Sequence, residues 1–367
     1  MSHNAAGFYG TGSVSREDGM INKTGRRFGG SILALGLVLL AQAAAAQTAP
    51  VTLIAYTSLQ KEVLAPYEAA FRKVHPEIQI AWVRDAGGVI HSRLLAERAN
   101  PRVDIIFGLP VTNIVGLYKE GLIEPYAPKG FEKLKPRFRD AREIPVWTGL
   151  EMYLNIICFN TIEAQKRNLQ KPTRWADLAN PIYRGQISMP SPAMSNTGYG
   201  YVHGWVQGMG ENAAWEFLDK LHQNVAVYTS SSATPCKYAS TGEYAIGLST
   251  DLTGPMMKTR GAPIDLIVPA DKTSWDIEAM ALPKGSKHPE AAKLMLNWAV
   301  TPEASQTFNK YYGIVGIPGL NNGPPNSIPD GDAYAADYSV EWSIDHRDRL
   351  IAEWFRRYNA KSEPKGN

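Results

Sequence analysis

The segment Pro190-Ser191-Pro192-Ala193-Met194-Ser195-Asn196-Thr197-Gly198-Tyr199-Gly200 has the pattern of a strand end, a proline-fixed loop and a helix start. Ser195, Asn196 and Thr197 favour the first positions of a helix, where backbone N–H groups have no partner within the helix. Such N–H groups can bind an anion. More often, this pattern marks an ordinary capped helix that binds no ligand. Residues elsewhere in the chain must therefore show whether this helix start binds an anion.

Size and charge set the class of protein. The chain has 367 residues, 44% of them hydrophobic, which is enough for two domains with cores of their own. The first 46 residues hold four of the 38 Lys and Arg residues and two of the 35 Asp and Glu residues, which leaves 34 and 33 after them. A net charge of about +1 lacks the basic excess of nucleic-acid binders, so we expect no nucleic-acid partner.

The N-terminal region, residues 1–46, predicts an export signal. A basic stretch at 23–27 precedes the apolar run 32–41, and small residues follow at 44–46. We expect export and cleavage after Ala46. Residues 1–19 are unusual in front of such a signal, which makes Met20 a candidate for the true start. The adjacent arginines leave the general and the twin-arginine export routes both open.

Two cysteines, Cys158 and Cys236, lie beyond this region. An even number in an exported chain allows one disulfide, and two buried free thiols are the alternative. Both cysteines fall in the same predicted domain, which favours the disulfide.

Strand-like and helical patterns alternate along the remaining chain. Segments 51–56, 78–83 and 103–107 predict strands, each followed by a loop such as 84–88 and then a helix; the same alternation resumes at the strand 154–159. Later strands are predicted at 186–189, 225–228 and 244–248, and later helices at 213–223, 293–300, 302–310 and 347–358. This order predicts an α/β protein with mostly parallel sheets, in which ligands bind beyond the carboxyl ends of the strands.

Several segments carry a family resemblance: Tyr56-Thr57-Ser58-Leu59, Trp82-Val83-Arg84-Asp85, Ile157-Cys158-Phe159-Asn160-Thr161, Ser195-Asn196-Thr197-Gly198, Thr234-Pro235-Cys236-Lys237, Ser274-Trp275-Asp276-Ile277-Glu278-Ala279 and the C-terminal 345–354. Through them the chain resembles the periplasmic solute-binding proteins of ABC importers, in the class of ferric, thiamine and polyamine binders. It is most similar to 2-aminoethylphosphonate binders. The resemblance implies a two-lobed, hinged fold of the type II periplasmic-binding class with two crossovers.

This fold implies a division of the chain and a set of partners. We expect a first lobe at 47–150 and 280–325, a second lobe at 151–279, and a C-terminal connector and packing helix at 326–367. The expected partners are a small-molecule ligand and a membrane permease that the closed protein docks. The protein is expected to be a periplasmic monomer without cofactor, metal or enzymatic activity.

The ligand class selects the candidate site residues. A phosphonate carries about −1.5 to −2 charges by analogy with a phosphate ester, and backbone N–H groups and hydroxyls hold such an anion well. An amino group needs carboxylate and aromatic partners. The anion-binding candidates are Tyr56, Thr57, Ser58, Gly87, Gly88, Ser195, Asn196, Thr197, Gly198, Ser230 and Ser231. The amine-binding candidates are Asp276, Glu278, Glu151 and Asp251, with Trp275 or Tyr228, and Asp276 is preferred because it follows a tryptophan.

Two departures from the aminoethylphosphonate pattern widen the ligand class. Ala86-Gly87 stands where a hydroxyl pair is expected, and the acidic-aromatic pair expected around Asp251 is missing. Glu151 also replaces a shorter carboxylate. Glycine N–H groups can still approach an anion closely, so a relative of 2-aminoethylphosphonate is equally consistent with the sequence.

Two alternatives remain. Ferric iron would need a tandem tyrosine after the strand 244–248, where the sequence reads Ser249-Thr250-Asp251; the pair Tyr311-Tyr312 follows a late helix and predicts packing. Thiamine and polyamines are further ligands of the same fold. A secreted hydrolase is the alternative from another class, but the chain has no Gly-x-Ser-x-Gly, His-Glu-x-x-His or phosphate-binding Gly-Lys-Ser/Thr motif.

Overall fold

The strands come from the apolar segments of the chain. The computed structural model describes residues 50–320 and 323–363. The predicted export signal, its cleavage site and the alternative start lie outside these residues. The strands of the described part are β1 (Val51–Thr57), β2 (Ile78–Arg84), β3 (Ile105–Pro110), β4 (Ile123–Glu124), β5 (Thr148–Asn160), β6 (Ile187–Pro190), β7 (Val225–Thr229), β8 (Ile246–Thr250), β9 (Ile264–Ile267), β10 (Trp275–Pro283) and β11 (Ile314–Val315).

Helices connect most of these strands. The α-helices are α1 (Lys61–Arg72), α2 (Gly87–Ala96), α3 (Val111–Lys119), α4 (Thr161–Lys166), α5 (Asn196–Met209), α6 (Glu211–Asn224), α7 (Thr234–Thr241), α8 (Thr253–Thr259), α9 (Pro289–Ala299), α10 (Pro302–Phe308), α11 (Val340–Asp345) and α12 (Arg347–Tyr358). None of the described helices is both long and apolar enough to cross a membrane.

The sheet runs in the order β2-β1-β3-β10-β5-β8-β6-β7, and β4, β9 and β11 pair with strands at its sides. In the first lobe β1 pairs in parallel with β2 and β3, and in the second lobe β6 pairs in parallel with β7 and β8. Each parallel pair is joined through a helix, as the alternating pattern predicts. The α/β prediction is confirmed, but the prediction of mostly parallel sheets was wrong, because β5 and β10 pair antiparallel with each of their neighbours.

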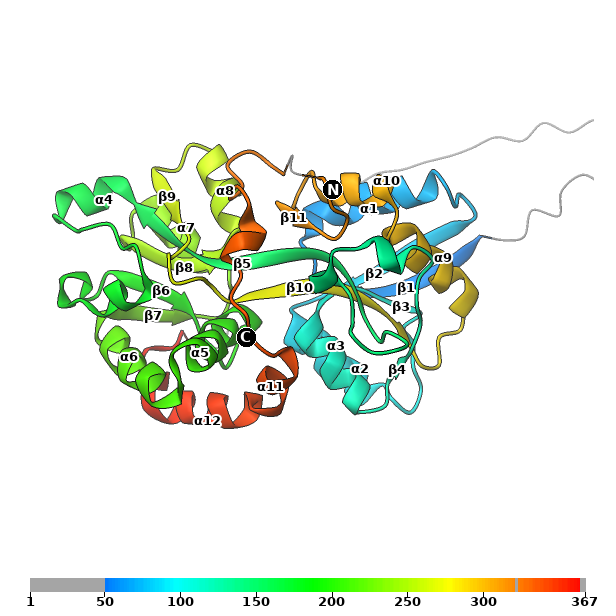
Figure 1. The fold of residues 1–367 in the computed structure, drawn as a ribbon, viewed down its shortest axis with the longest axis horizontal. Coiled ribbons are helices and arrows are strands. Elements are labelled where there is room, and N and C mark those ends of the chain that lie inside the picture. Colours follow the sequence, from blue (N-terminus) through cyan, green and yellow to red (C-terminus); the bar gives the residue numbers. More distant parts are fainter. Residues whose placement is uncertain (1–49, 321–322, 364–367) are drawn as a thin grey trace, which may run out of the picture. The chain divides into compact units, whose positions relative to one another are not determined.

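Two long antiparallel strands connect the lobes (Figure 1). The first part of β5 pairs with β10, and its last residues, from Asn155 onward, pair with β8 and β9 in the second lobe. β10 runs the opposite way and pairs with β3 in the first lobe. The chain thus crosses from one lobe to the other on β5 and returns on β10.

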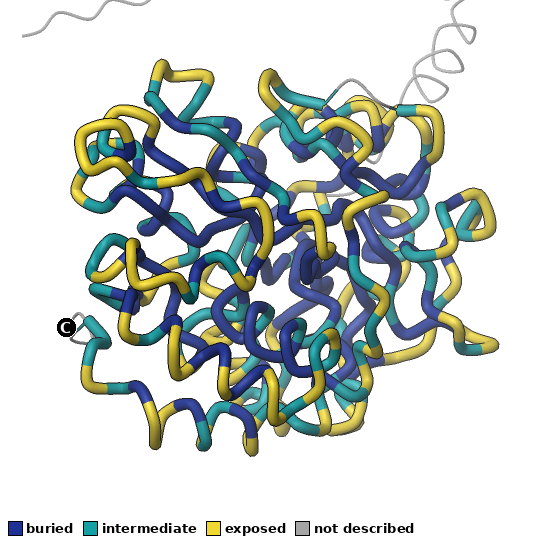
Figure 2. The backbone as a smooth tube through the Cα atoms, turned by 60° about the vertical axis from the view of Figure 1, so that its left-hand side comes forward, coloured by how far each residue is buried: buried dark blue, intermediate teal, exposed yellow. Residues whose placement is uncertain are grey.

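Buried hydrophobic residues of the described part form two clusters. Figure 2 colours the backbone by how far each residue is buried. The larger cluster surrounds β1, β3 and β10 and includes Leu53, Ile106 and Ile277. The second surrounds β6, β7 and α5 and includes Met189 and Trp205. The exact residue ranges predicted for the two lobes stay a prediction.

The C-terminal segment contacts both lobes. Leu350, Trp354 and Tyr358 of α12 belong to the second cluster. α11 lies against α3 of the first lobe, where Lys119 pairs with Asp345 (Figure 1). The segment predicted as a connector and packing helix is therefore also a third link between the lobes.

Some predicted boundaries were wrong. Residues 87 and 88 were assigned to a loop, but they form the first turn of α2. The strand predicted at 103–107 is shifted to β3, and the one predicted at 244–248 is shifted by two residues to β8. The 13-residue strand β5 begins at Thr148, six residues before the predicted start. For the three strands, pairing with a distant strand fixes the boundary, and the local pattern does not contain that information.

Candidate functional site

A cavity of about 600 Å³ lies between the two lobes. Its walls come from the loops at the carboxyl ends of the parallel strands, where the fold class predicts the ligand. The loops that line it are 58–62, 84–88 and Pro110 in the first lobe and 194–197, 230–233 and 250–253 (without Asp251) in the second. Tyr153 of β5, Lys237 of α7, Met256 of α8, Glu278 of β10 and Tyr312 complete the lining.

Six helices begin at this cavity, because the first residue or the N-cap residue of each belongs to its lining: α1, α2, α3, α5, α7 and α8. The first N–H groups of a helix have no partner within it and carry the positive end of its dipole. The N-cap residues of α1, α2, α7 and α8 make no side-chain hydrogen bond to these groups, whereas the carboxylate of Asp276 occupies the start of α3. The cavity therefore offers uncapped helix N-termini to an anion from both lobes.

The segment at α5 is a further exception. Ser195 Oγ accepts a hydrogen bond from Gly198 N at 3.4 Å and so caps its own helix. Asn196 Nδ2 donates to Asn113 Oδ1 of α3 at 2.6 Å, which links the lobes at one edge of the cavity. At α5, therefore, Ser195 is an ordinary helix cap, which is the more common of the two meanings of this sequence pattern. Asn196 links the two lobes.

Hydroxyl groups lie beside the helix ends. Ser58 Oγ is within 3.1 Å of Gly108 O and 3.3 Å of Glu278 Oε2, and it can donate to either acceptor. Ser231 Oγ accepts from Ala233 N at 3.2 Å. Ser230 and Thr250 also line the cavity. These groups can donate hydrogen bonds to an anion from both lobes.

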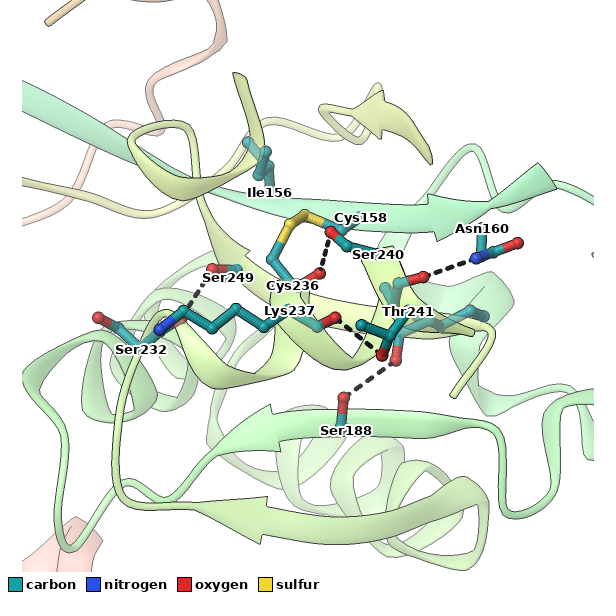
Figure 3. Close-up of a disulfide and its surroundings, with 12 residues drawn as sticks. Ile156, Cys158, Asn160, Ser188, Ser232, Cys236, Lys237, Ser240, Thr241 and Ser249 are labelled. Carbon is teal, nitrogen blue, oxygen red and sulfur yellow. Dashed lines mark hydrogen bonds between the residues drawn. A yellow bond between two sulfur atoms is a disulfide. The ribbon is translucent and has the colours of Figure 1, made fainter. Parts of the chain in front are cut away.

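Three basic side chains line the cavity: Lys61, Arg84 and Lys237. Arg84 Nε donates to Leu59 O at 2.7 Å, which fixes the guanidinium near the start of α1. Lys237 lies in the first turn of α7 and its side chain extends toward Ser232 (Figure 3). These cations strengthen the preference of the helix ends for a negative group.

Glu278 is the buried carboxylate in the lining. Burial and, to a lesser extent, the negative charge of Asp276 raise the pKa of Glu278 to about 8, and the Ser58 hydroxyl opposes the shift. A buried carboxylate that faces an open cavity without a basic partner is unfavourable unless it is neutral or a cation pairs with it. Glu278 can therefore hold a cationic group.

Several predicted site residues line this cavity: Ser58, Gly87, Gly88, Ser195, Asn196, Thr197, Ser230, Ser231 and Glu278. Gly87 is required by its contacts, because a Cβ atom there would lie 2.9 Å from Asn196 Nδ2. Whether these residues bind a ligand stays a prediction.

Other predicted anion-binding residues lie outside the lining. Tyr56 donates its hydroxyl to Glu97 Oε2 at 2.7 Å, and Glu97 follows the C-terminal end of α2, whereas the cavity lies at the start of that helix. Thr57 Oγ1 is buried; it donates to Gly108 O and accepts from Leu59 N, so it shapes the loop that carries Ser58. Gly198 gives α5 room to pack, because a Cβ atom there would lie 2.6 Å from Pro190 O.

Most of the predicted amine-binding residues already form hydrogen bonds with other groups of the protein. Asp276, which was preferred over Glu278, accepts from Thr112 Oγ1 at 2.9 Å and holds the start of α3. Asp251 Oδ1 accepts from Leu154 N at 2.8 Å. Trp275 donates to Ala336 O at 2.7 Å. Tyr228 lies 2.9 Å from His222 Nδ1 and stacks on that ring.

The sequence analysis missed Tyr153, Tyr312, Lys61 and Lys237, which line the cavity. Tyr312 packs in the larger buried cluster, as predicted, and in addition it lines the cavity. Lys237 had a signal, since it follows Cys236 within a segment of the family resemblance. Tyr153 had none, because its position depends on the pairing of β5 with β10.

Cys158 and Cys236 form a disulfide, with their Cα atoms 5.4 Å apart (Figure 3). It joins β5 to the first turn of α7. The bond therefore fixes the helix that presents Lys237 to the cavity.

Metal-binding groups are lacking in the described part of the chain, where no three His, Cys, Asp or Glu side chains gather into a metal site. The residues after β8 read Asp251-Leu252-Thr253, so a tandem tyrosine is missing with the corrected strand boundary as well.

Comparisons with known proteins identify the family. Residues 100–336 match the family described as bacterial extracellular solute-binding protein. The chain belongs to this family. It is therefore a solute-binding, non-enzymatic component of a transport system.

The individual relatives share less than 30% sequence identity with this chain. An uncharacterized protein of Haemophilus influenzae is 29% identical over 288 residues, which cover 78% of this chain and 82% of that protein. A probable ABC transporter periplasmic-binding protein of Sinorhizobium fredii is 23% identical and covers 65% and 67%. The solved structure of the periplasmic binding protein AfuA from Actinobacillus pleuropneumoniae, with fructose-6-phosphate bound, has a TM-score of 0.76 at 24% identity and covers 84% and 99%. This structural likeness shows the fold alone.

Proposed function

We propose that this solute-binding protein captures 2-aminoethylphosphonate, or a related compound with a phosphonate or phosphate group and an amino group, for an ABC importer. The observation that carries the proposal is the pairing of two features in one cavity. Uncapped helix ends and hydroxyls form the anion-binding part of the cavity, and Glu278 provides a carboxylate for a cationic group.

The anion-binding part favours a phosphonate or phosphate group. Such a group has three acceptor oxygens and about −1.5 to −2 charges, so it can use N–H groups, hydroxyls and cations from several loops at once. Gly87 and Gly88 of α2 and Ser230 and Ser231 of the second lobe supply such donors. AfuA, which has the same fold, carries a phosphorylated sugar in its solved structure.

The size of the cavity widens the choice within this ligand class. About 600 Å³ is more than 2-aminoethylphosphonate needs, and lies in the usual range for larger ligands. A longer aminophosphonate or an amino-bearing sugar phosphate would also fit. This agrees with the departures from the aminoethylphosphonate pattern at Ala86 and Asp251.

The alternatives within the fold fit the cavity less well. A ferric site would need several phenolate and carboxylate oxygens, whereas Lys61, Arg84 and Lys237 bring positive charge to the lining. The same cations oppose a polyamine, which carries only positive charge, although Glu62, Asp85 and Glu278 of the same lining would attract it.

We further propose that the ligand closes the lobes about β5 and β10. A ligand favours closure when it makes contacts in the closed form that the open form lacks. Ser58 and Ser230 lie on different lobes, so a phosphonate between them would gain contacts on closure. The closed, monomeric protein would then dock its permease in the inner membrane, after export to the periplasm and removal of residues 1–46.

A thermal-shift panel on ligand-stripped protein tests the ligand class. The panel contains 2-aminoethylphosphonate, ethylphosphonate, phosphate, fructose-6-phosphate, putrescine, thiamine and ferric citrate. A ligand at about 100 times its Kd stabilises the folded state by about 2.7 kcal/mol. We expect the largest shift with 2-aminoethylphosphonate or fructose-6-phosphate. A shift with ferric citrate or putrescine and none with the phosphorus compounds would refute the proposal.

A further inference from the structure

Two glutamates face each other on the strands that connect the lobes. Glu151 of β5 and Glu278 of β10 are paired directly in the antiparallel register. Residues opposite each other in such a pair point to the same side of the sheet, with Cβ atoms about 4.5–5.5 Å apart. Glu151 is fully buried and Glu278 is 7% exposed, at the floor of the cavity.

Glu151 has few partners. The hydroxyl of Tyr67, from α1, donates to Glu151 Oε1 at 3.4 Å. Its other oxygen, Oε2, has no hydrogen-bond partner in the described part of the protein. A buried, ionised carboxylate with an unpaired oxygen is strongly unfavourable, and protonation of that oxygen removes the charge.

The surroundings add negative charge. Asp276 follows the same face of β10 two residues before Glu278, and its charge raises the pKa of Glu278. The nearby titratable groups from other elements are Tyr67 of α1, Tyr153 of β5, Asp251 after β8, and Tyr312 after α10. The positive group in this neighbourhood is Arg84, which acts on Tyr312 and donates its Nε to Leu59 O. Ser58 contributes a hydroxyl to Glu278.

Burial and mutual repulsion have the same effect on both carboxyls. Burial raises the pKa of Glu151 well above its ordinary value, and the charge of Glu278 raises it further. Two carboxyls so close together titrate as a pair, so the bound protons belong to both.

We propose that Glu151 and Glu278 are protonated in the ligand-free protein, and that the cationic group of the ligand expels a proton from Glu278 to solvent while Glu151 stays neutral. This rests on the proposed function, because it assigns the amino group of the ligand to Glu278. The bond that breaks is the O–H bond of Glu278, and the ion pair with the ligand replaces it. Glu151 is then a positioning residue that keeps a second negative charge away from the pair.

Carbon-13 NMR of protein labelled at the glutamate side-chain carboxyls tests this directly. Glu151→Gln and Glu278→Gln assign the two resonances, and Glu290→Gln, at an exposed position on α9, serves as an unrelated control. In ligand-free protein at pH 6.5 we expect both carboxyls to show the shift of the protonated acid. Adding 2-aminoethylphosphonate should move Glu278 to the carboxylate shift and leave Glu151 protonated, whereas ethylphosphonate, which lacks the amino group, should leave both protonated.

The outcomes separate the two proposals. If both carboxyls titrate in the ordinary range of exposed glutamates, the proton pair does not exist and the inference is wrong, whatever the ligand. If 2-aminoethylphosphonate binds and Glu278 stays protonated, the displacement of its proton is wrong. If neither phosphonate changes any resonance, the proposed ligand is wrong, and the ligand-free titration still decides whether the pair holds its protons.

Discussion

At the scale of single residues, the proposed function assigns the choice of ligand to Glu278. Helix N-termini and hydroxyls would accept almost any small anion, because they recognise charge and acceptor oxygens. In the proposal above, the carboxyl of Glu278 in the same cavity is neutral without ligand and ionises when an amino group pairs with it. The neighbouring Asp276, two residues away on the same strand, cannot take this role because its oxygens hold the start of α3.

Glu278→Gln should therefore weaken binding of 2-aminoethylphosphonate. The variant keeps the shape and loses a charge-assisted hydrogen bond, which contributes about 1.5–3 kcal/mol, or a roughly 10- to 150-fold change in Kd. Isothermal titration calorimetry measures the change. Ethylphosphonate is the control: its Kd should not rise, and an equal loss for both compounds would contradict the assignment of the amino group to Glu278.

Gly87 makes the second residue-scale prediction. In Gly87→Ala the new methyl lies 2.9 Å from Asn196 Nδ2 and displaces the amide that donates to Asn113. The loss of this hydrogen bond should lower the free energy of unfolding by about 0.5–1.5 kcal/mol. Urea unfolding of the ligand-free protein measures the loss.

Gly88→Ala is the matched control for that substitution. It adds the same methyl one residue later in α2, where no atom lies within 4 Å. Because alanine restricts the unfolded chain, this variant should be neutral or more stable by about 0.4–1 kcal/mol. Equal destabilisation by the two substitutions would show that the contact with Asn196 is not the cause.

At the scale of elements, the disulfide between β5 and α7 supports the second-lobe wall of the cavity. Replacing both Cys158 and Cys236 by alanine should lower the free energy of unfolding by about 2–4 kcal/mol, because the bond closes a long loop in the unfolded chain. Urea unfolding followed by tryptophan fluorescence measures this. The wild-type protein unfolded with a reductant should show a similar loss, and an unchanged midpoint in both cases would contradict the prediction.

The contact between α5 and α11 predicts a pH effect on stability. Burial lowers the pKa of His203 to about 3, with Arg347 adding to the shift, and His203 Nδ1 lies 3.2 Å from Ser343 Oγ. Between its ordinary pKa and this value the unfolded chain binds a proton that the folded protein does not bind. The free energy of unfolding should therefore fall as the pH drops below about 6.5, by about 1.4 kcal/mol per unit from this group.

Urea unfolding at pH 4.5, 5.5 and 6.5 checks the pH effect. The slope against pH should be smaller in His203→Gln than in the wild-type protein, whatever the stability of the variant at pH 6.5. Parallel slopes for the two proteins would mean that His203 does not cause the pH dependence.

Much of the element order could be predicted from sequence, because apolar alternation and helix periodicity are local. The helix at 347–358 was predicted with the same bounds as α12, and the predicted end of β1 was one residue too early. β10 was not predicted as a strand that connects the lobes, since nothing within Trp275–Pro283 shows its pairing with β5, more than 100 residues earlier. The same limit applies to the candidate site. The loops that follow the strands could be predicted as parts of the site from the strand pattern. Tyr153 and the roles of Asp276 and Glu278 could not, because they depend on the pairing of β5 with β10.

At the scale of the whole described protein, three segments connect the lobes: β5, β10 and the C-terminal segment with α11 and α12. Arg142 of the first lobe lies 3.7 Å from Glu341 of α11, and α12 packs on α5 in the second lobe. The proposed closure about β5 and β10 would have to preserve or shift the contact of α11 with α3. The cavity lies where the loops of both lobes meet, so the ligand and these connections act on the same movement.

A crystal structure of the protein with 2-aminoethylphosphonate tests the central claim most directly. We predict that the phosphonate oxygens accept hydrogen bonds from N–H groups at the start of α2 or α7 and from hydroxyls of both lobes. The amino group should lie within hydrogen-bond distance of Glu278. A phosphonate bound outside this cavity, or an amino group that points to solvent while Glu278 contacts no cation, would contradict the account.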